Sequence, residues 1–335
     1  MKKFISQLSH GLLATFALVT TTQAQDFSIH LKNIYEEVIE HNAKQATASC
    51  YILEEQLQTL TDNKPESIKP AFTQLIKDWK AVEATYILGD LNEDYLDTPR
   101  RIDIFRQGKE DWQTQLNRAL EGKSEPKAAL FKHSSRSINA LEFMLFQDSH
   151  ISDREQAFAI HITQSICRHL HDIEQGYQQA KTKFLAEQDK SLSYIVHSLA
   201  SSIFAARDWR IGDSRGLSRK YKGKPDIRRT EYFLSNRSAD ALSSIFNVHQ
   251  QVFGLNNQER LNAILAYYKE EKLASEIKDN LNKIQAILKQ TSTDKALFDN
   301  GETIYQISHQ LYQQYYISMV AALPIVAKVL DADGD

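Results

Sequence analysis

Apolar residues recur every three or four positions along most of this chain, the spacing that places them on one face of an α-helix. The clearest stretch is 27–61, where the pattern predicts one long amphipathic helix. The motif Asp62-Asn63-Lys64-Pro65 predicts where this helix ends, because proline disrupts a helix interior. By the same reasoning, further helices are expected at about 70–88, 108–121, 129–147, 153–188, 191–206, 236–253, 257–269, 272–291 and 301–330.

Residues that favour turns are scarce, with 11 glycines and 6 prolines in 335 residues. Few turns imply few, long elements, so the sequence predicts an all-α protein of one large domain or two modest ones. A polar stretch at 187–190 is the expected junction. It divides the chain into an N-terminal helical bundle over 25–188 and a C-terminal helical bundle over 189–335.

One long irregular segment, 208–229, is expected between the helices of the second bundle. Long loops in compact proteins are commonly functional or disordered. This one is rich in arginine and lysine, so it could bind an anion, pair with a buried carboxylate such as Glu142 or Glu231, or lie solvated with local ion pairs.

The first residues have the pattern of a secretory signal peptide. Lys2 and Lys3 precede a short apolar run at 11–19, and small residues lead up to an expected cleavage between Ala24 and Gln25. The run is too short for a transmembrane helix, and no later segment is long and apolar enough to span. No cysteine follows the signal for lipid attachment, so we expect an exported, periplasmic protein.

The net charge of −3 becomes −5 when the two lysines of the signal are removed. This acidic balance argues against general binding to nucleic acids or anionic membranes. Only two cysteines are present, Cys50 and Cys167. Both fall on apolar helical faces, so we expect buried free thiols, with a disulfide as the alternative in an oxidising compartment.

The most informative segment is Arg136-Ser-Ile-Asn-Ala-Leu-Glu-Phe-Met-Leu-Phe146, which sets Glu142 among apolar residues at helical spacing. Asn139 lies three residues earlier and shares a helix face with Glu142. Burying a carboxylate is costly unless it is paired, hydrogen-bonded or bound to a cation. We therefore expect an arginine or a set of hydrogen bonds to hold Glu142.

Recognisable catalytic motifs are missing from the sequence. It contains no HExxH, no CxxC, no GxSxG and no phosphate-binding loop. His161, His169 and His171 cluster, but residues two apart on a helix point in different directions, so ordinary histidines are the better interpretation. The C-terminal Asp331-Ala-Asp-Gly-Asp335 lacks the rest of a calcium loop and is interpreted as a polar tail.

Several of these motifs, in this order, resemble the imelysin-like family of exported bacterial proteins, especially its predicted periplasmic lipoprotein branch. The resemblance covers most of the chain after the signal. It is carried by Trp79-Lys-Ala-Val-Glu83-Ala-Thr-Tyr86, Thr98-Pro-Arg-Arg-Ile-Asp103, Ala140-Leu-Glu-Phe-Met-Leu-Phe146, Arg207-Asp-Trp-Arg-Ile-Gly212, Glu231-Tyr-Phe-Leu-Ser235, Ser238 and Asp331-Ala-Asp-Gly-Asp335.

The resemblance implies two helical bundles with a cleft between them and a role in bacterial iron acquisition. The family's GxHxxE motif is degenerate here, with Ser137 for the glycine, Asn139 for the histidine and only Glu142 retained. Iron or another metal is the cofactor that the family suggests, although a neutral amide is a poor ligand beside imidazole. The residues expected to line the cleft are Trp79, Glu83, Arg101, Asp103, Asn139, Glu142, Asp208, Arg210, Glu231 and Ser235.

Three functions fit these features. The leading hypothesis is a non-catalytic binding protein that acts with iron-uptake components of the cell envelope, with no catalytic residue assigned. The second is a metal-dependent peptidase, as the older family name suggests. It would need protein ligands for a metal and an activated water. In the third, the polar residues are a structural network that joins the two bundles.

Overall fold

The computed structural model describes residues 27–106, 110–255 and 258–325. Within these ranges the chain forms helices and no strands, which confirms the all-α prediction. The expected signal peptide, with its cleavage between Ala24 and Gln25, lies outside the described residues, and so does the acidic motif at 331–335. None of the described helices is both long enough and apolar enough to cross a membrane.

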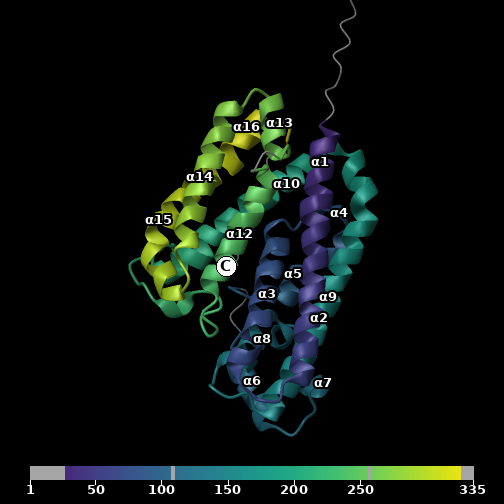
Figure 1. Cartoon of the computed structure of the whole chain (residues 1–335), viewed down its shortest axis with the longest axis vertical. Coiled ribbons are helices and arrows are strands. Elements are labelled where there is room, and N and C mark those ends of the chain that lie inside the picture. Colours follow the sequence, from purple (N-terminus) through teal and green to yellow (C-terminus); the bar gives the residue numbers. More distant parts are fainter. Residues whose placement is uncertain (1–26, 107–109, 256–257, 326–335) are drawn as a thin grey trace, which may run out of the picture.

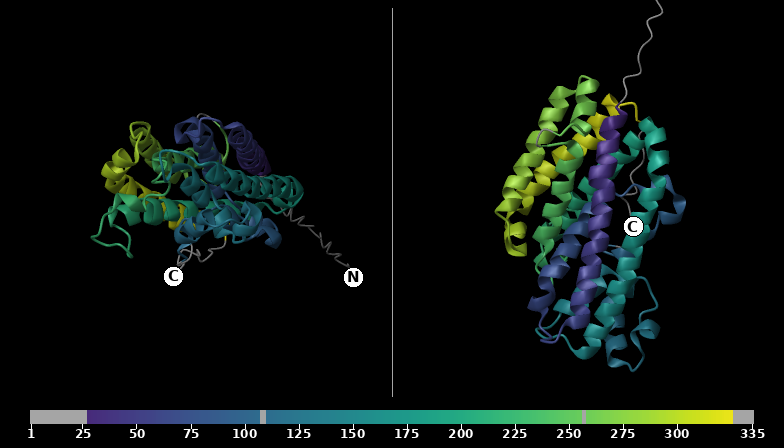
Figure 2. Two further views of the ribbon diagram at one scale, coloured as in Figure 1. Left: turned by 90° about the horizontal axis from the view of Figure 1, so that it is seen from below. Right: turned by 45° about the vertical axis from the view of Figure 1, so that its right-hand side comes forward.

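The helices gather in two groups that lie side by side (Figures 1 and 2). The first group contains the N-terminal elements. They are α1 (Ser28–Ile34), η1 (Tyr35–Glu40), α2 (His41–Thr59), α3 (Pro65–Ala84), α4 (Leu88–Leu91), η2 (Glu93–Tyr95), α5 (Thr98–Ile102), α6 (Trp112–Glu121), α7 (Pro126–Ala129), η3 (Ser134–Arg136), α8 (Ile138–Phe146) and α9 (Asp153–Ala186).

The second group contains the C-terminal elements, and its helix α12 packs along α3 of the first group. Its members are α10 (Gln188–Phe204), η4 (Ala205–Gly212), α11 (Asp213–Arg215), η5 (Ile227–Arg229), α12 (Ser238–Phe253), α13 (Leu261–Tyr267), α14 (Glu271–Lys289), α15 (Asp294–Gln313), η6 (Gln314–Met319) and α16 (Val320–Ala322). The break between α9 and α10 falls at Glu187, inside the polar stretch expected to be a junction.

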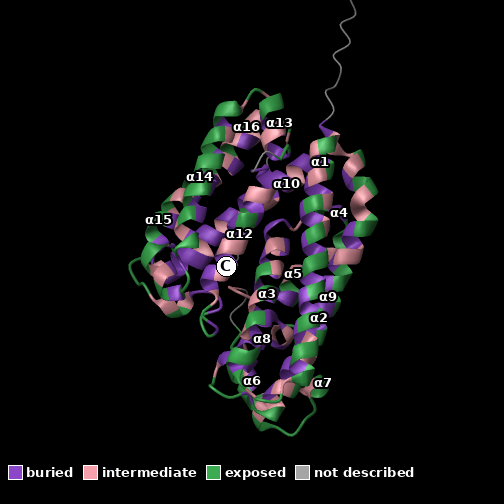
Figure 3. Cartoon of the chain, in the orientation of Figure 1, coloured by how far each residue is buried: buried purple, intermediate pink, exposed green. Residues whose placement is uncertain are grey.

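The long helix predicted at 27–61 is present as a continuous run of α1, η1 and α2, with a π-helical stretch in the middle. Its buried residues recur at helical spacing, so buried and exposed positions alternate along α2 in Figure 3. Pro65 opens α3 at its first turn, where a missing N–H is tolerated. The stop motif at 62–65 therefore separates these two helices, as predicted.

Several predicted boundaries differ from the structure by a few residues, and two elements differ in kind. The stretch 129–147 is not one helix, because it divides into the end of α7, the short turn η3 and α8. The irregular segment does not begin at residue 208, since the chain stays helical through η4 and α11. The helix ends at Gly216, which has φ +69°, and a Cβ there would lie 2.8 Å from the backbone nitrogen of Pro225.

The expectation of free thiols is also wrong, because Cys50 on α2 and Cys167 on α9 form a disulfide with a Cα–Cα distance of 5.5 Å. The apolar spacing correctly placed both sulfurs in the interior. It could not show that the two helices bring their buried faces together at these two positions. The bond closes a loop over a sequence separation of 117 residues.

We predict that a Cys50→Ala, Cys167→Ala double variant loses about 2–4 kcal/mol of unfolding free energy, because a cross-link over a long loop restricts the unfolded chain. Urea unfolding with and without a reductant measures this. Reductant should destabilise the wild-type protein and leave the double variant unchanged. Equal sensitivity of the two proteins to reductant would contradict the assignment.

Candidate functional site

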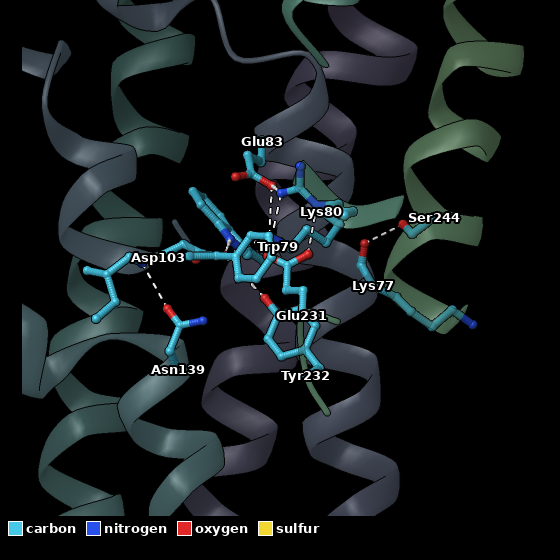
Figure 4. Close-up of polar contacts among 12 residues, drawn as sticks. Lys77, Trp79, Lys80, Glu83, Asp103, Asn139, Glu231, Tyr232 and Ser244 are labelled. Carbon is cyan, nitrogen blue, oxygen red and sulfur yellow. Dashed lines mark hydrogen bonds and ion pairs between the residues drawn. The ribbon is translucent and has the colours of Figure 1, made fainter. Parts of the chain in front are cut away.

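A fully buried lysine, Lys80 on α3, lies at the centre of a polar network between the two groups of helices (Figure 4). Its Nζ is 2.6 Å from Asp103, 2.6 Å from Glu231 and 2.8 Å from Glu83. Burial alone would lower the pKa of Lys80, but these three carboxylates outweigh it and raise the pKa above its usual value. Lys80 is therefore a charged group that the protein interior fully compensates.

Arg210 provides the second cation, and it reaches the network from the π-helical segment η4. Its Nε donates to Glu231 at 2.7 Å, and one terminal nitrogen donates to Glu83 at 2.8 Å. Lys80 and Arg210 thus meet the same two carboxylates, and both cations can only donate hydrogen bonds. Both oxygens of Glu231 accept from cationic donors, which makes it the bridge between Lys80 and Arg210. Burial raises the pKa of Glu231, and the charges of Arg210 and Lys80 oppose that shift.

Asp103 joins the network through donors on both of its oxygens. Its Oδ2 accepts from Lys80 at 2.6 Å, Trp79 Nε1 at 3.0 Å and the Tyr232 hydroxyl at 3.2 Å. Its Oδ1 accepts from the backbone N–H of Phe105 at 2.8 Å. Burial pushes the pKa of Asp103 up, but the nearby Lys80 charge and these hydrogen bonds bring it down to about 2.

Glu142 lies in a second polar cluster on α8, a helix whose nine residues are all buried. Its Oε1 accepts from the backbone N–H of Ser235 at 2.9 Å and from the Ser235 hydroxyl at 2.7 Å. Hydrogen bonds hold this carboxyl, one of the two arrangements expected from the sequence. Burial raises the pKa of Glu142 to about 7, assisted by Asp294 and Glu231 and opposed by Ser235.

Asn139 and Ser137 explain how the degenerate motif fits its surroundings. The Asn139 side-chain oxygen accepts from the backbone N–H of Ile104 at 2.8 Å, fixing the loop that carries Asp103 (Figure 4). Ser137 replaces the family's glycine and caps α8 by accepting from the N–H of Ala140. Both departures from the motif therefore serve local structure.

The segment 230–237, between η5 and α12, connects these clusters, and we call it the bridging segment. It contributes Glu231, Tyr232 and Ser235 to the contacts described above. Tyr232 and Asn236 both have φ +57°, so the backbone turns through the left-handed region twice within a short distance. Ser238, at the start of α12, then donates its N–H and hydroxyl to Asp294 at 2.9 and 2.7 Å.

Eight of the ten candidate residues lie in these two clusters, and two do not. Asp208 instead pairs with Arg207, whose Nε lies 2.6 Å from its Oδ2, and Arg101 is exposed on α5. Most clustered residues are buried, but the Glu83 side chain is 29% exposed. Outside the clusters, the Asp208 side chain is 18% exposed. The clustered candidates are Trp79, Glu83, Asp103, Asn139, Glu142, Arg210, Glu231 and Ser235.

Sequence reasoning missed Lys80, Tyr232 and Asp294. Lys80 had a detectable signal, because it follows Ile76 by four residues and so lies on the apolar face of α3. A lysine on such a face needs carboxylates opposite it. Tyr232 and Asp294 had no comparable signal, because their partners are distant in sequence.

A metal ion fits these residues poorly. Across the described residues, no group of three or more His, Cys, Asp or Glu side chains is arranged to hold one. Glu142 already accepts two hydrogen bonds from Ser235, and the Asn139 oxygen is occupied by a backbone N–H. The site is a buried polar network with one strongly ionised carboxylate and one carboxyl that titrates near neutrality.

Comparison with known proteins identifies the family of this all-α chain. The sequence profile described as Imelysin, or peptidase M75, matches residues 35–314, so the chain belongs to the imelysin family. A crystal structure of an imelysin-like protein from Psychrobacter arcticum 273-4 is similar, with a TM-score of 0.75 and 17% identity, covering 90% of this chain and 96% of that one. Comparison with curated protein sequences gives no match.

We predict that Lys80→Met destabilises the protein by about 3–5 kcal/mol, since it leaves buried carboxylates without their cation. Urea unfolding checks this value. Lys77→Met is the matched control, because Lys77 lies on the exposed side of the same helix and should change stability by less than about 0.5 kcal/mol. An equal loss of unfolding free energy in the two variants would show that the network does not stabilise the charge of Lys80.

We also predict that stability falls as the pH rises from about 4.5 to about 7. A carboxyl whose pKa is raised on folding binds more protons in the folded state than in the unfolded state across this window, so Glu142 destabilises the protein as it ionises. Its contribution is about 3 kcal/mol.

Urea unfolding at a series of pH values should show a shallower decline for Glu142→Gln, whose amide oxygen can still accept from Ser235. Burial also raises the pKa of Asp294, to about 6, so Asp294→Asn should remove a separate part of the same decline. An unchanged slope in the Glu142→Gln variant would contradict the raised pKa of Glu142.

Proposed function

We propose that this imelysin-family chain is an exported, non-catalytic binding protein that works with iron-uptake components of the cell envelope. One observation carries the non-catalytic part: donors from the chain itself engage the site carboxylates. Asp103 accepts from Lys80, Trp79 and Tyr232, and Glu142 accepts from Ser235. A metal or water at Asp103 Oδ2 would have to displace three of these donors, and one at Glu142 Oε1 would have to displace Ser235.

Two features support export to the periplasm. The N-terminal residues have the composition of a signal peptide, with a basic start and a short apolar run. The disulfide between Cys50 and Cys167 is the kind of bond that persists in oxidising compartments and is rare in the cytosol.

The binding role rests on two partly exposed carboxylates, Glu83 in the network and Asp208 outside it. The side chain of Glu83 keeps 29% of its exposure while it accepts from Lys80 and Arg210, so its position is fixed by buried partners. Asp208 keeps 18% and is held by the neighbouring Arg207. In this proposal the buried ion pairs form a rigid base, and a ligand or partner contacts Glu83 and Asp208.

The association with iron uptake follows from family membership. Asn139 in place of histidine favours recognition of a ligand or partner protein over direct binding of a bare transition metal, since an amide oxygen is a weak ligand for such ions. The retained Glu142 then serves to hold the bridging segment through Ser235.

One observation favours the enzymatic alternative, a metal-dependent peptidase. The pKa of the buried Glu142 is about 7, and a carboxyl that exchanges its proton near neutrality has the property of a general base. Under this alternative, Glu142→Gln abolishes activity without loss of folding. Under the purely structural alternative, substitutions in the network affect only stability.

Complementation under iron limitation separates the three functions. A strain that lacks this protein should grow more slowly in iron-poor medium, and Glu142→Gln should restore growth because the proposal gives this residue no catalytic role. A Glu83→Gln, Asp208→Asn double variant should fail to restore growth while remaining folded in thermal unfolding. Glu302→Gln, an exposed residue of α15, is the matched control and should restore growth fully.

Other outcomes of the complementation experiment would support a different function. Failure of folded Glu142→Gln to restore growth, with loss of a metal-dependent peptide cleavage that the wild-type protein shows, would establish the peptidase. Full complementation by the double variant would leave only the structural role. Unchanged growth of the deletion strain would reject the link to iron.

A further inference from the structure

A second concentration of charge lies away from the central network, along one face of α9. The short elements α5, α7 and η3 all pack against this helix. Together they carry basic or imidazole side chains on neighbouring surfaces, which we call the α9 basic face. Its members are Arg101, Lys127, His133, Arg136, His161, Arg168 and His169.

The geometry of α9 places these groups together. His161 and Arg168 are seven residues apart, which is two helical turns, so they lie on the same side of the helix about 10 Å apart along its axis. Arg136 affects His161 and His133 electrostatically, and Arg101 affects His133 and His169. Residues from four elements therefore share one electrostatic environment.

The four permanent cations of this face are not neutralised within the described residues. Arg101, Lys127, Arg136 and Arg168 form no ion pair there with a carboxylate within 4.0 Å. Arg136 donates instead to the backbone carbonyls of Phe131 and Lys132.

Two neighbouring cations, in contrast, do form ion pairs with carboxylates. Arg100 pairs with Asp97 at 3.6 Å, and Lys132 pairs with Glu110 at 2.5 Å. The four cations that converge on the histidines therefore keep their charge without an ion pair among the described residues, although their direct neighbours do not. This arrangement concentrates positive charge on a chain with a net charge of −3.

Burial and the positive charges around the histidines lower the pKa values of their imidazoles. Burial lowers the pKa of His133, and Arg136 and Arg101 lower it further. Burial also lowers the pKa of His161, with contributions from Arg136, Arg168 and Lys127. At neutral pH these imidazoles are uncharged hydrogen-bonding groups, and the arginines and Lys127 supply the charge.

An exposed aromatic residue accompanies the charges. Phe131 keeps 72% of its exposure, two residues before His133, on the turn between α7 and η3. Arginine and aromatic side chains are enriched in protein interfaces and carry much of their binding energy. Arg136 donates to the Phe131 carbonyl, so the exposed phenylalanine lies beside one of the unpaired arginines. This arrangement fits a partner that offers carboxylates next to an apolar side chain.

We propose that the α9 basic face is a docking surface for an acidic segment of a partner protein. Carboxylates of that segment pair with Arg101 and Arg168, and an apolar residue beside them packs on Phe131. Charge complementarity carries the choice of partner, since four cations without an ion pair in the described part of the chain gather around α9 and the rest of the acidic chain would repel an extended polyanion.

Fluorescence anisotropy of a labelled Glu-Glu-Leu repeat peptide against the purified full-length chain tests this surface. The peptide should bind at low salt, and a Gln-Gln-Leu repeat of the same length should not. An Arg101→Glu, Arg168→Glu double variant should weaken binding by about 10-fold or more, with weaker binding also at high salt. Phe131→Ala should weaken binding by about 3-fold or more at every salt concentration.

Lys272→Glu is the matched control, because this lysine on α14 is 92% exposed and should leave binding within about 2-fold of wild type. Thermal unfolding verifies that each variant is folded. Failure of the acidic peptide to bind, or equal weakening by Lys272→Glu and the double variant, would overturn the proposal. Tighter binding to vesicles that contain phosphatidylglycerol than to the peptide would reject a protein partner.

Discussion

The charge on Lys80 is the constraint on which the junction of the two helical groups depends. A cation without water around it must be surrounded by anions, and here they come from three parts of the chain: α3, the loop after α5 and the bridging segment. Arg210 then balances the carboxylates that Lys80 draws together. Helix packing brings α3 and α12 side by side, but the ion pairs determine which residues of the adjoining loops must meet there.

The bridging segment contacts carboxyl groups of two kinds, which differ in their surroundings and in their pKa values. At one end Glu231 is held as an anion between two cations, whereas Ser235 contacts a carboxyl that is neutral for part of the physiological range. Ser238 contacts Asp294, whose pKa is also raised. The segment is thus fixed firmly by charge at its start and more weakly by hydrogen bonds further on. With these pKa values, the Glu142 cluster changes its charge near neutral pH, whereas Asp103 in the central network stays ionised.

The fold and part of the site were predictable because helical periodicity is a local signal. The apolar faces gave the all-α class, and an acid within an apolar run marked Glu142 as a residue that needed donors. The disulfide, the helical course of η4 and the donors from Ser235 were not predictable, since each depends on which faces meet in space. Lys80 lies between these cases: its place on an apolar face was visible, but one partner, Glu231, is 151 positions away.

Lys80 and Glu231 are 151 positions apart, so they are synthesised at different times. When α3 and the loop that carries Asp103 have emerged from a ribosome, Glu231 and Arg210 have not yet followed. The disulfide partners Cys50 and Cys167 both precede them, so the first group of helices can be covalently closed while Lys80 still lacks one of its anions. The late arrival of the bridging segment is then the step that allows the junction to exclude water.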